Sequence, residues 1–172
     1  MSRCFSTASL EVLPCFPVEC AVLWYKHSFG VINVKDVVIT VVGKQAQPDG
    51  SDEDIIELVT EGKYEYDNSR IIISYQESEL TGFAGCTTMF TVSPDRIVLN
   101  RIGSESGDMI FEAGKRHQYF YATDAGDLML GVNTIRCSNQ LHEGGGNLEI
   151  SYLLDFDDKV FSRNSFTIGI RS

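Results

Sequence analysis

From Val34 onward the chain alternates apolar and polar positions in short runs, and turn signals recur about every 8–12 residues. Alternation with a period of two is typical of strands whose two faces meet different surroundings. Glycine, proline, aspartate and asparagine separate the runs, which is the chemistry that turns require. Gly62 interrupts one run and predicts a bulge or bend there. The pattern predicts about ten short strands and no helix.

Strands at this spacing are typical of an all-β sandwich or barrel. The short connections predict antiparallel pairing of successive strands, and closure into a barrel removes exposed edges. We therefore predict one antiparallel β-barrel of about 8–10 strands within residues 34–172. Its expected core consists of apolar residues that share one face of each strand: Val37 or Val38, Leu58, Ile71, Ile73, Leu128, Leu130, Leu148, Ile150, Phe166 and Ile168.

Residues 71–80 form the most informative segment. Read as a strand, this segment places Ile71, Ile73, Tyr75, Glu77 and Glu79 on one face. A strand that lines a barrel with an apolar floor and charged groups near an opening has this order of side chains. We therefore expect Glu77 and Glu79 to point inward near one end of the barrel.

Buried carboxylates need partners, and Arg116 and His117 are the candidates. A bidentate pair with Arg116 would satisfy one carboxylate, and His117 shares its strand face with Tyr119 and Tyr121. The predicted ligand-binding residues are therefore Tyr75, Glu77, Glu79, Arg116, His117 and Tyr121. Two interpretations stay open: a pocket that is apolar at depth and polar at its mouth, or a filled barrel that a structural ion pair holds shut.

The first 33 residues differ in composition from the rest of the chain. They contain Pro14 and Pro17, which break helices, and three of the five cysteines. We expect this N-terminal extension to be poorly ordered or loosely docked, or to reflect a misassigned start near Val31 or Val34. An intact mass of the native protein that includes residues 1–33 would contradict the second possibility.

The net charge of −10 argues against nucleic acid and anionic lipid as partners, because like charges repel. No run approaches the roughly 18 apolar residues of a membrane-spanning helix. An odd number of irregularly spaced cysteines argues against a disulfide framework and for a reducing compartment. The oligomeric state stays open.

The sequence contains no recognisable catalytic or metal site. There is no G-x-S-x-G elbow, no phosphate loop and no C-x-x-C, and the three histidines lie far apart. Glu77 and Glu79 would be neighbours on one strand face, whereas a glycosidase pair flanks its substrate. We therefore assign no catalytic residue, metal or cofactor, and prefer binding of a small, partly apolar ligand inside the barrel. The alternative is a non-enzymatic structural or protein-interaction module with a filled barrel.

Several short segments together resemble a known family. They include EG at residues 61–62, SYQESELTG at 74–82, MIFEAG at 109–114, RH at 116–117, YAT at 121–123, GV at 131–132 and LEISY at 148–152. This combination resembles the YwiB-like family, the domain-of-unknown-function family numbered 1934. The resemblance implies a small, cytoplasmic, bacterial barrel of the calycin (lipocalin-like) type. It implies no reaction, ligand or catalytic residue.

Overall fold

The computed structural model describes residues 33–103, 107–121, 126 and 128–171, so the predicted N-terminal extension lies outside the described residues apart from Asn33. No helix among them is long and apolar enough to cross a membrane. The described elements are β1 (Val34–Ala46), β2 (Asp54–Asp67), β3 (Arg70–Gln76), the 3₁₀ turn η1 (Glu79–Thr81), β4 (Thr87–Val92), β5 (Ile97–Ile102), β6 (Gly107–Phe111), β7 (Arg116–Tyr121), β8 (Leu128–Asn139), β9 (Gly145–Phe156) and β10 (Lys159–Arg171).

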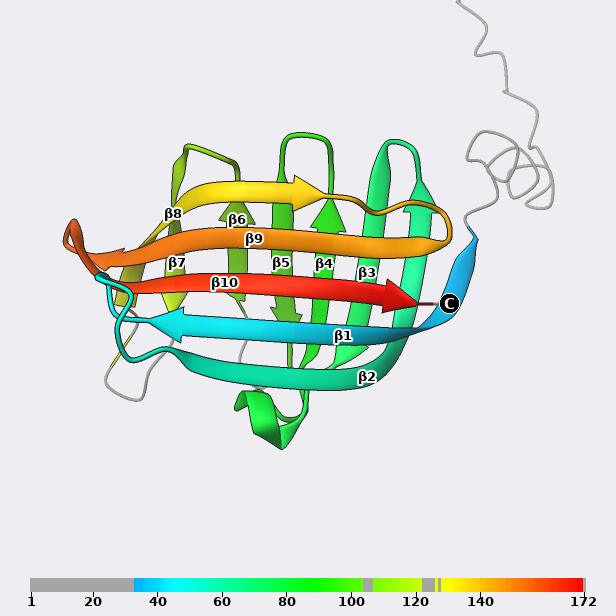
Figure 1. Ribbon diagram of the computed structural model, residues 1–172, viewed down its shortest axis with the longest axis horizontal. Coiled ribbons are helices and arrows are strands. Elements are labelled where there is room, and N and C mark those ends of the chain that lie inside the picture. The colour runs from blue at the N-terminus through cyan, green and yellow to red at the C-terminus, as the bar shows by residue number, and fades with distance from the viewer. Residues whose placement is uncertain (1–32, 104–106, 122–125, 127, 172) are drawn as a thin grey trace, which may run out of the picture. The chain divides into compact units, whose positions relative to one another are not determined.

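These ten strands form one sheet in the order β6-β5-β4-β3-β2-β1-β10-β9-β8-β7, with every ladder antiparallel. Strands β8, β9, β10, β1 and β2 run across β3 to β7 (Figure 1). The two end strands, β6 and β7, lie beside each other without a ladder. The sheet is therefore a nearly closed barrel, and the prediction of a single antiparallel β-barrel is confirmed.

Strand β2 connects the two sets of strands. It pairs with β1 along most of its length and begins to pair with β3 at Gly62, opposite Tyr75. In Figure 1 β2 curves between the two sets. A Cβ atom at Gly62 would lie 2.3 Å from Cδ1 of Ile39 and 2.5 Å from the carbonyl oxygen of Ser74, so a side chain does not fit. The predicted bulge is absent, because both registers run through Gly62 without a shift, but the predicted bend occurs.

The core fills the space between the two sets of strands. Most of the predicted core residues are buried, and Val37 rather than Val38 faces inward. Phe166 is half-buried and packs against the core. The prediction for Leu128 is wrong: this residue is 41% exposed, because it is the first residue of β8, where the strand pattern begins.

Aromatic rings occupy much of the barrel interior. The ring centroids of Phe111 and Tyr152 are 5.1 Å apart, those of Tyr152 and Phe166 are 5.9 Å apart, and those of Phe166 and Phe90 are 6.4 Å apart. Rings at these separations attract each other as well as burying apolar surface. These four rings therefore fill part of the barrel interior.

Candidate functional site

The predicted strand at residues 71–80 ends earlier than expected. Strand β3 stops at Gln76, and Ser78 begins the single turn η1, which Gly82 closes in the left-handed conformation. A 3₁₀ turn does not keep the period of two, so Glu79 does not follow Glu77 inward. Glu79 is exposed, and its predicted inward orientation is wrong.

Glu77 points into the barrel, as predicted. Its side chain is only 2% exposed. Its carboxylate accepts hydrogen bonds from the hydroxyl groups of Thr88 at 2.5 Å and Thr81 at 2.8 Å. Nε of Arg101 lies 3.8 Å from Oε1 of Glu77, an ion-pair distance. These contacts supply the partners that a buried carboxylate needs.

Arg101 is the cation that the sequence analysis missed. Its guanidinium carbon lies 3.6 Å from the ring centroid of Phe83, in a cation–π arrangement. Tyr75 lies beside Glu77, and burial raises the pKa of its phenol, with the Glu77 carboxylate as a second cause. A signal for Arg101 exists in the sequence. Arg101 is two residues after Leu99 and four after Ile97 in β5, so the period of two predicts that it shares their inner face. We call Tyr75, Glu77, Thr88 and Arg101 the η1-end cluster.

Arg116 lies on the outer face of the barrel. Its Nε and Nη2 donate to the two carboxylate oxygens of Asp155 at 3.0 and 2.6 Å, and Nδ2 of Asn133 donates to the same group at 3.0 Å. The hydrogen bond from Arg116 lowers the pKa of Asp155. Our pairing of Arg116 with Glu77 or Glu79 is therefore wrong, since Arg116 and His117 are consecutive in β7 and face opposite sides.

His117 and Tyr121 take the inner face of β7, with Tyr119 between them. Nε2 of His117 lies 3.6 Å from Oε1 of Glu112 and has no hydrogen-bond partner among the described residues. The rings of Tyr119 and Tyr121 have centroids 6.2 Å apart, and Tyr121 is 37% exposed. The predicted common face of these side chains is confirmed, but they do not adjoin Glu77.

A pocket of about 670 Å³ opens at the end of β4 that lies away from η1. We call it the mouth pocket, and it is lined by Val92, Ser93, Pro94, Asp95, Arg96, Ile97, Phe111, Glu112, Ala113, Lys115, Cys137 and Asn139. Val92, Ile97 and Phe111 belong to the packed core and form its apolar part. Neither Glu77 nor Arg116 lines this pocket, so the predicted site residues do not surround it.

Basic side chains converge on Glu112 at the mouth pocket. Lys115 donates a short hydrogen bond to its carboxylate, and Nε of Arg96 lies 3.9 Å from Oε1. The hydrogen bond from Lys115 lowers the pKa of Glu112, while burial raises the pKa of the Cys137 thiol. Sequence reasoning missed this arrangement because the β4–β5 turn, the β6–β7 connection and the end of β8 are distant in sequence.

The described residues contain no group of three or more His, Cys, Asp or Glu side chains that could hold a metal ion. The carboxylates of Glu77 and Glu112 instead accept hydrogen bonds from neighbouring side chains. The arrangement is suited to holding a molecule by shape and charge. It offers no activated nucleophile or acid–base pair aimed into the mouth pocket.

Comparison with known proteins agrees with the fold. The chain is similar to the uncharacterised β-barrel protein YwiB of Bacillus subtilis (strain 168), at 25% identity over 134 residues, which cover 78% of this chain and 93% of that protein. The crystal structure of YwiB from Bacillus subtilis matches with a TM-score of 0.60 and 22% identity over 81% of this chain and 96% of that one. The calycin assignment stays a prediction. The family model of the domain of unknown function DUF1934 matches residues 39–168, and the chain therefore belongs to the DUF1934 family.

Proposed function

We propose that this barrel binds a small, partly apolar ligand in the mouth pocket. The observation that carries the proposal is the pocket itself, with its volume of about 670 Å³, apolar core residues on one side and charged residues on its rim. Ligand sites are typically clefts of about 300–1,000 Å³ that combine apolar walls with a few polar groups. The row of aromatic rings leaves the middle of the barrel filled, so the ligand would lie at the mouth.

The proposed function is binding without catalysis. Glu112 and Lys115 are engaged with each other, and burial raises the pKa of the Cys137 thiol, which makes it a weaker nucleophile. We also propose a cytoplasmic location, because an odd number of irregularly spaced cysteines is typical of proteins in reducing compartments.

Native mass spectrometry of the protein purified from its own host tests this function. We expect a co-purifying small molecule on the wild-type chain, and its loss from Ala113→Trp, because an indole at this exposed wall position would occupy the pocket. Ala84→Trp is the matched control, since Ala84 is exposed near η1 and does not line the pocket. Absence of any bound molecule, together with no thermal shift across a metabolite library, would overturn the proposal.

A second candidate is a structural or protein-interaction module. The η1-end cluster favours it, because Glu77 is closed off and paired and the aromatic row fills the interior beside it. A barrel of this kind would stabilise its shape without a ligand. In the same experiment it predicts that wild type and Ala113→Trp carry no small molecule and have equal thermal stability.

A further inference from the structure

We propose that the ligand of the mouth pocket is a small organic anion, with an apolar body and one carboxylate that Arg96 binds. This inference rests on the proposed function and adds the chemical class of the ligand. It starts from the charged residues that line the pocket, which are Asp95, Arg96, Glu112 and Lys115. Their formal charges cancel, so the recognition depends on which of them are already engaged.

Glu112 and Lys115 are engaged with each other. Lys115 donates a short hydrogen bond to the Glu112 carboxylate, and the side chain of Glu112 is only 16% exposed. The charge of Glu112 is therefore compensated within the protein.

Arg96 keeps its hydrogen-bonding capacity. The nearest carboxylate oxygen is Oε1 of Glu112, 3.9 Å from Nε of Arg96. The guanidinium group donates no hydrogen bond to any residue that the structure describes. The side chain is half exposed and lines the pocket. A guanidinium presents its donors in a fork that matches the two oxygens of a carboxylate. Arg96 can thus bind an incoming carboxylate without first releasing a partner.

The other lining residues define the rest of the ligand. Val92, Ile97 and Phe111 offer apolar contact next to the turn that carries Arg96, so an apolar body is expected beside the anionic group. Asp95 lies in the same exposed turn and opposes an anion. Solvent screens its charge, whereas Arg96 can make direct charge-assisted hydrogen bonds.

Three probes with the same eight-carbon body test the inference: octanoate, octanol and octylamine. Binding to the full-length chain is measured by isothermal titration at low salt. We expect octanoate to bind about 10 to 100 times more tightly than octanol, the range of one charge-assisted interaction. Ala113→Trp should abolish binding of both probes, which locates them in the mouth pocket.

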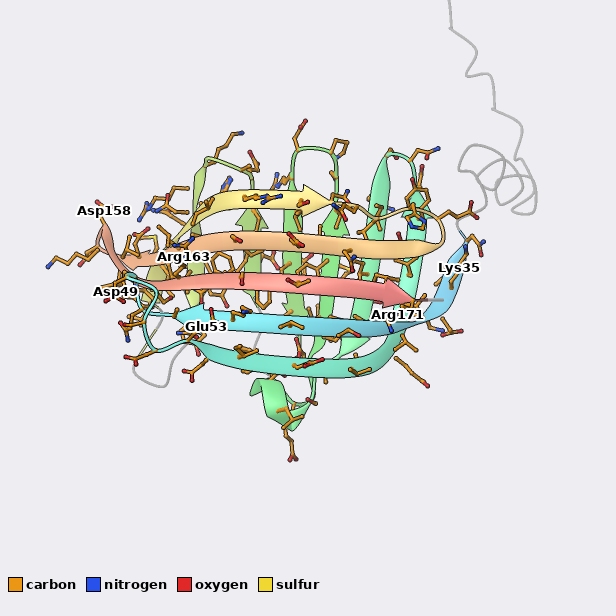
Figure 2. All side chains as sticks on the ribbon, in the orientation of Figure 1. Lys35, Asp49, Glu53, Asp158, Arg163 and Arg171 are labelled. Carbon is orange, nitrogen blue, oxygen red and sulfur yellow. The ribbon has the colours of Figure 1, made fainter. Side chains whose placement is uncertain are left out.

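Substitution of Arg96 separates its role from general electrostatics. We expect Arg96→Gln to reduce octanoate affinity to that of octanol, and Arg96→Lys to retain part of the preference because it keeps the charge without the fork. Arg163→Gln is the matched control: it removes the same charge from an exposed position of β10, labelled in Figure 2, that does not line the pocket. A thermal stability equal to that of the wild-type chain would show that each variant is folded.

The possible outcomes distinguish this inference from the proposed function. Equal affinity for octanoate and octanol, both lost in Ala113→Trp, would overturn the anionic ligand and leave the pocket supported. Tighter binding of octylamine would overturn it in favour of recognition through Asp95. An octanoate preference unchanged in Arg96→Gln would assign the selectivity to other residues and also overturn it. If no probe binds the wild-type chain, the inference fails, and the mass-spectrometric experiment alone decides the proposed function.

Discussion

The guanidinium of Arg116 binds the carboxylate of Asp155 in a bidentate pair on the outer face of the barrel, 39 residues apart in sequence. Gly131 lies under the pair: a Cβ atom there would be 2.2 Å from Oδ2 of Asp155 and 2.5 Å from Nη2 of Arg116. The glycine lets both side chains lie against the sheet, which leaves the Asp155 side chain only 2% exposed. The Asp155 carboxylate is thus buried on the outer face of the sheet, and the guanidinium of Arg116 balances its charge.

Removing the charge of Asp155 should destabilise the barrel. Asp155→Asn keeps the shape of the side chain but removes its negative charge and replaces one of the two accepting oxygens by an NH₂ group, so we expect a loss of about 1.5–3 kcal/mol in the free energy of unfolding. Urea unfolding followed by circular dichroism measures it. Asp158→Asn is the control, because the side chain of Asp158, labelled in Figure 2, is 90% exposed at the β9–β10 turn. Its carboxylate lies 3.3 Å from Nη2 of the same guanidinium, and exposed ion pairs contribute little to stability. Equal effects of the two substitutions would contradict the prediction.

The same pair should make stability fall in acid. Arg116 lowers the pKa of Asp155 from its ordinary value of 3.8, so the folded state holds the carboxylate charged at a pH where the unfolded chain takes up a proton. The contribution is complete above the unfolded pKa and is lost as the pH falls through the lower folded pKa. Unfolding free energies measured below about pH 5 should therefore decline less steeply for Asp155→Asn than for wild type.

Glu112 also has a lowered pKa and titrates in the same window, through its hydrogen bond with Lys115. Glu112→Gln therefore serves as the companion variant. An acid profile that changes in Glu112→Gln but not in Asp155→Asn would assign the acid sensitivity to the mouth pocket.

The hydroxyl group of Thr88 should stabilise the folded state through its hydrogen bond to Glu77 at the η1 end of the barrel. Thr88→Val preserves volume but removes the 2.5 Å hydrogen bond to the buried carboxylate of Glu77, at an expected cost of about 1.5–3 kcal/mol. Thr91→Val is matched to it, because Thr91 lies on the opposite face of the same strand. We expect that change to stay within about 0.5 kcal/mol. Comparable losses in both variants would show that the bond to Glu77 is not the cause.

A methyl group at Gly62 should strain the bend of β2. Gly62→Ala would place Cβ 2.3 Å from the side chain of Ile39 and 2.5 Å from a backbone oxygen of Ser74, and overpacking of this kind costs about 1–3 kcal/mol. At Gly43 the nearest atom to such a Cβ is a ring carbon of Phe166 at 3.7 Å, an ordinary contact. Gly43→Ala should therefore change thermal stability little or raise it, and a loss as large as that of Gly62→Ala would refute the steric explanation.

Much of the fold could be predicted from the alternation along the chain. Ile71, Ile73 and Tyr75 face inward and are buried, as their period of two predicts. The same period failed beyond Gln76, because η1 follows and rotates Glu79 into solvent. For Leu128 the period of two predicts the face but not the burial. Leu128 and the buried Leu130 are two residues apart in β8, but Leu128 begins the strand and stays partly exposed.

The candidate site was less accessible to sequence reasoning. The inward orientation of Glu77 follows from the strand period, but its cation, Arg101, lies in β5, and no sequence pattern links the two residues. The mouth pocket combines the turn at Arg96, the connection at Glu112 and Lys115, and Cys137 near the end of β8. No local pattern marks such a set, because its members become neighbours only when the barrel closes.

The sequence by itself determined the strands, the face that each strand buries and hence the barrel, since the alternation of apolar side chains is a local property that burial enforces. Only the tertiary structure decided which charges meet. It paired Arg116 with Asp155 and left Glu77 to Thr81, Thr88 and Arg101, because register and the end of each strand set the distances between charges. The same closure placed the mouth pocket at the end of β4 opposite η1, where connections distant in sequence come together.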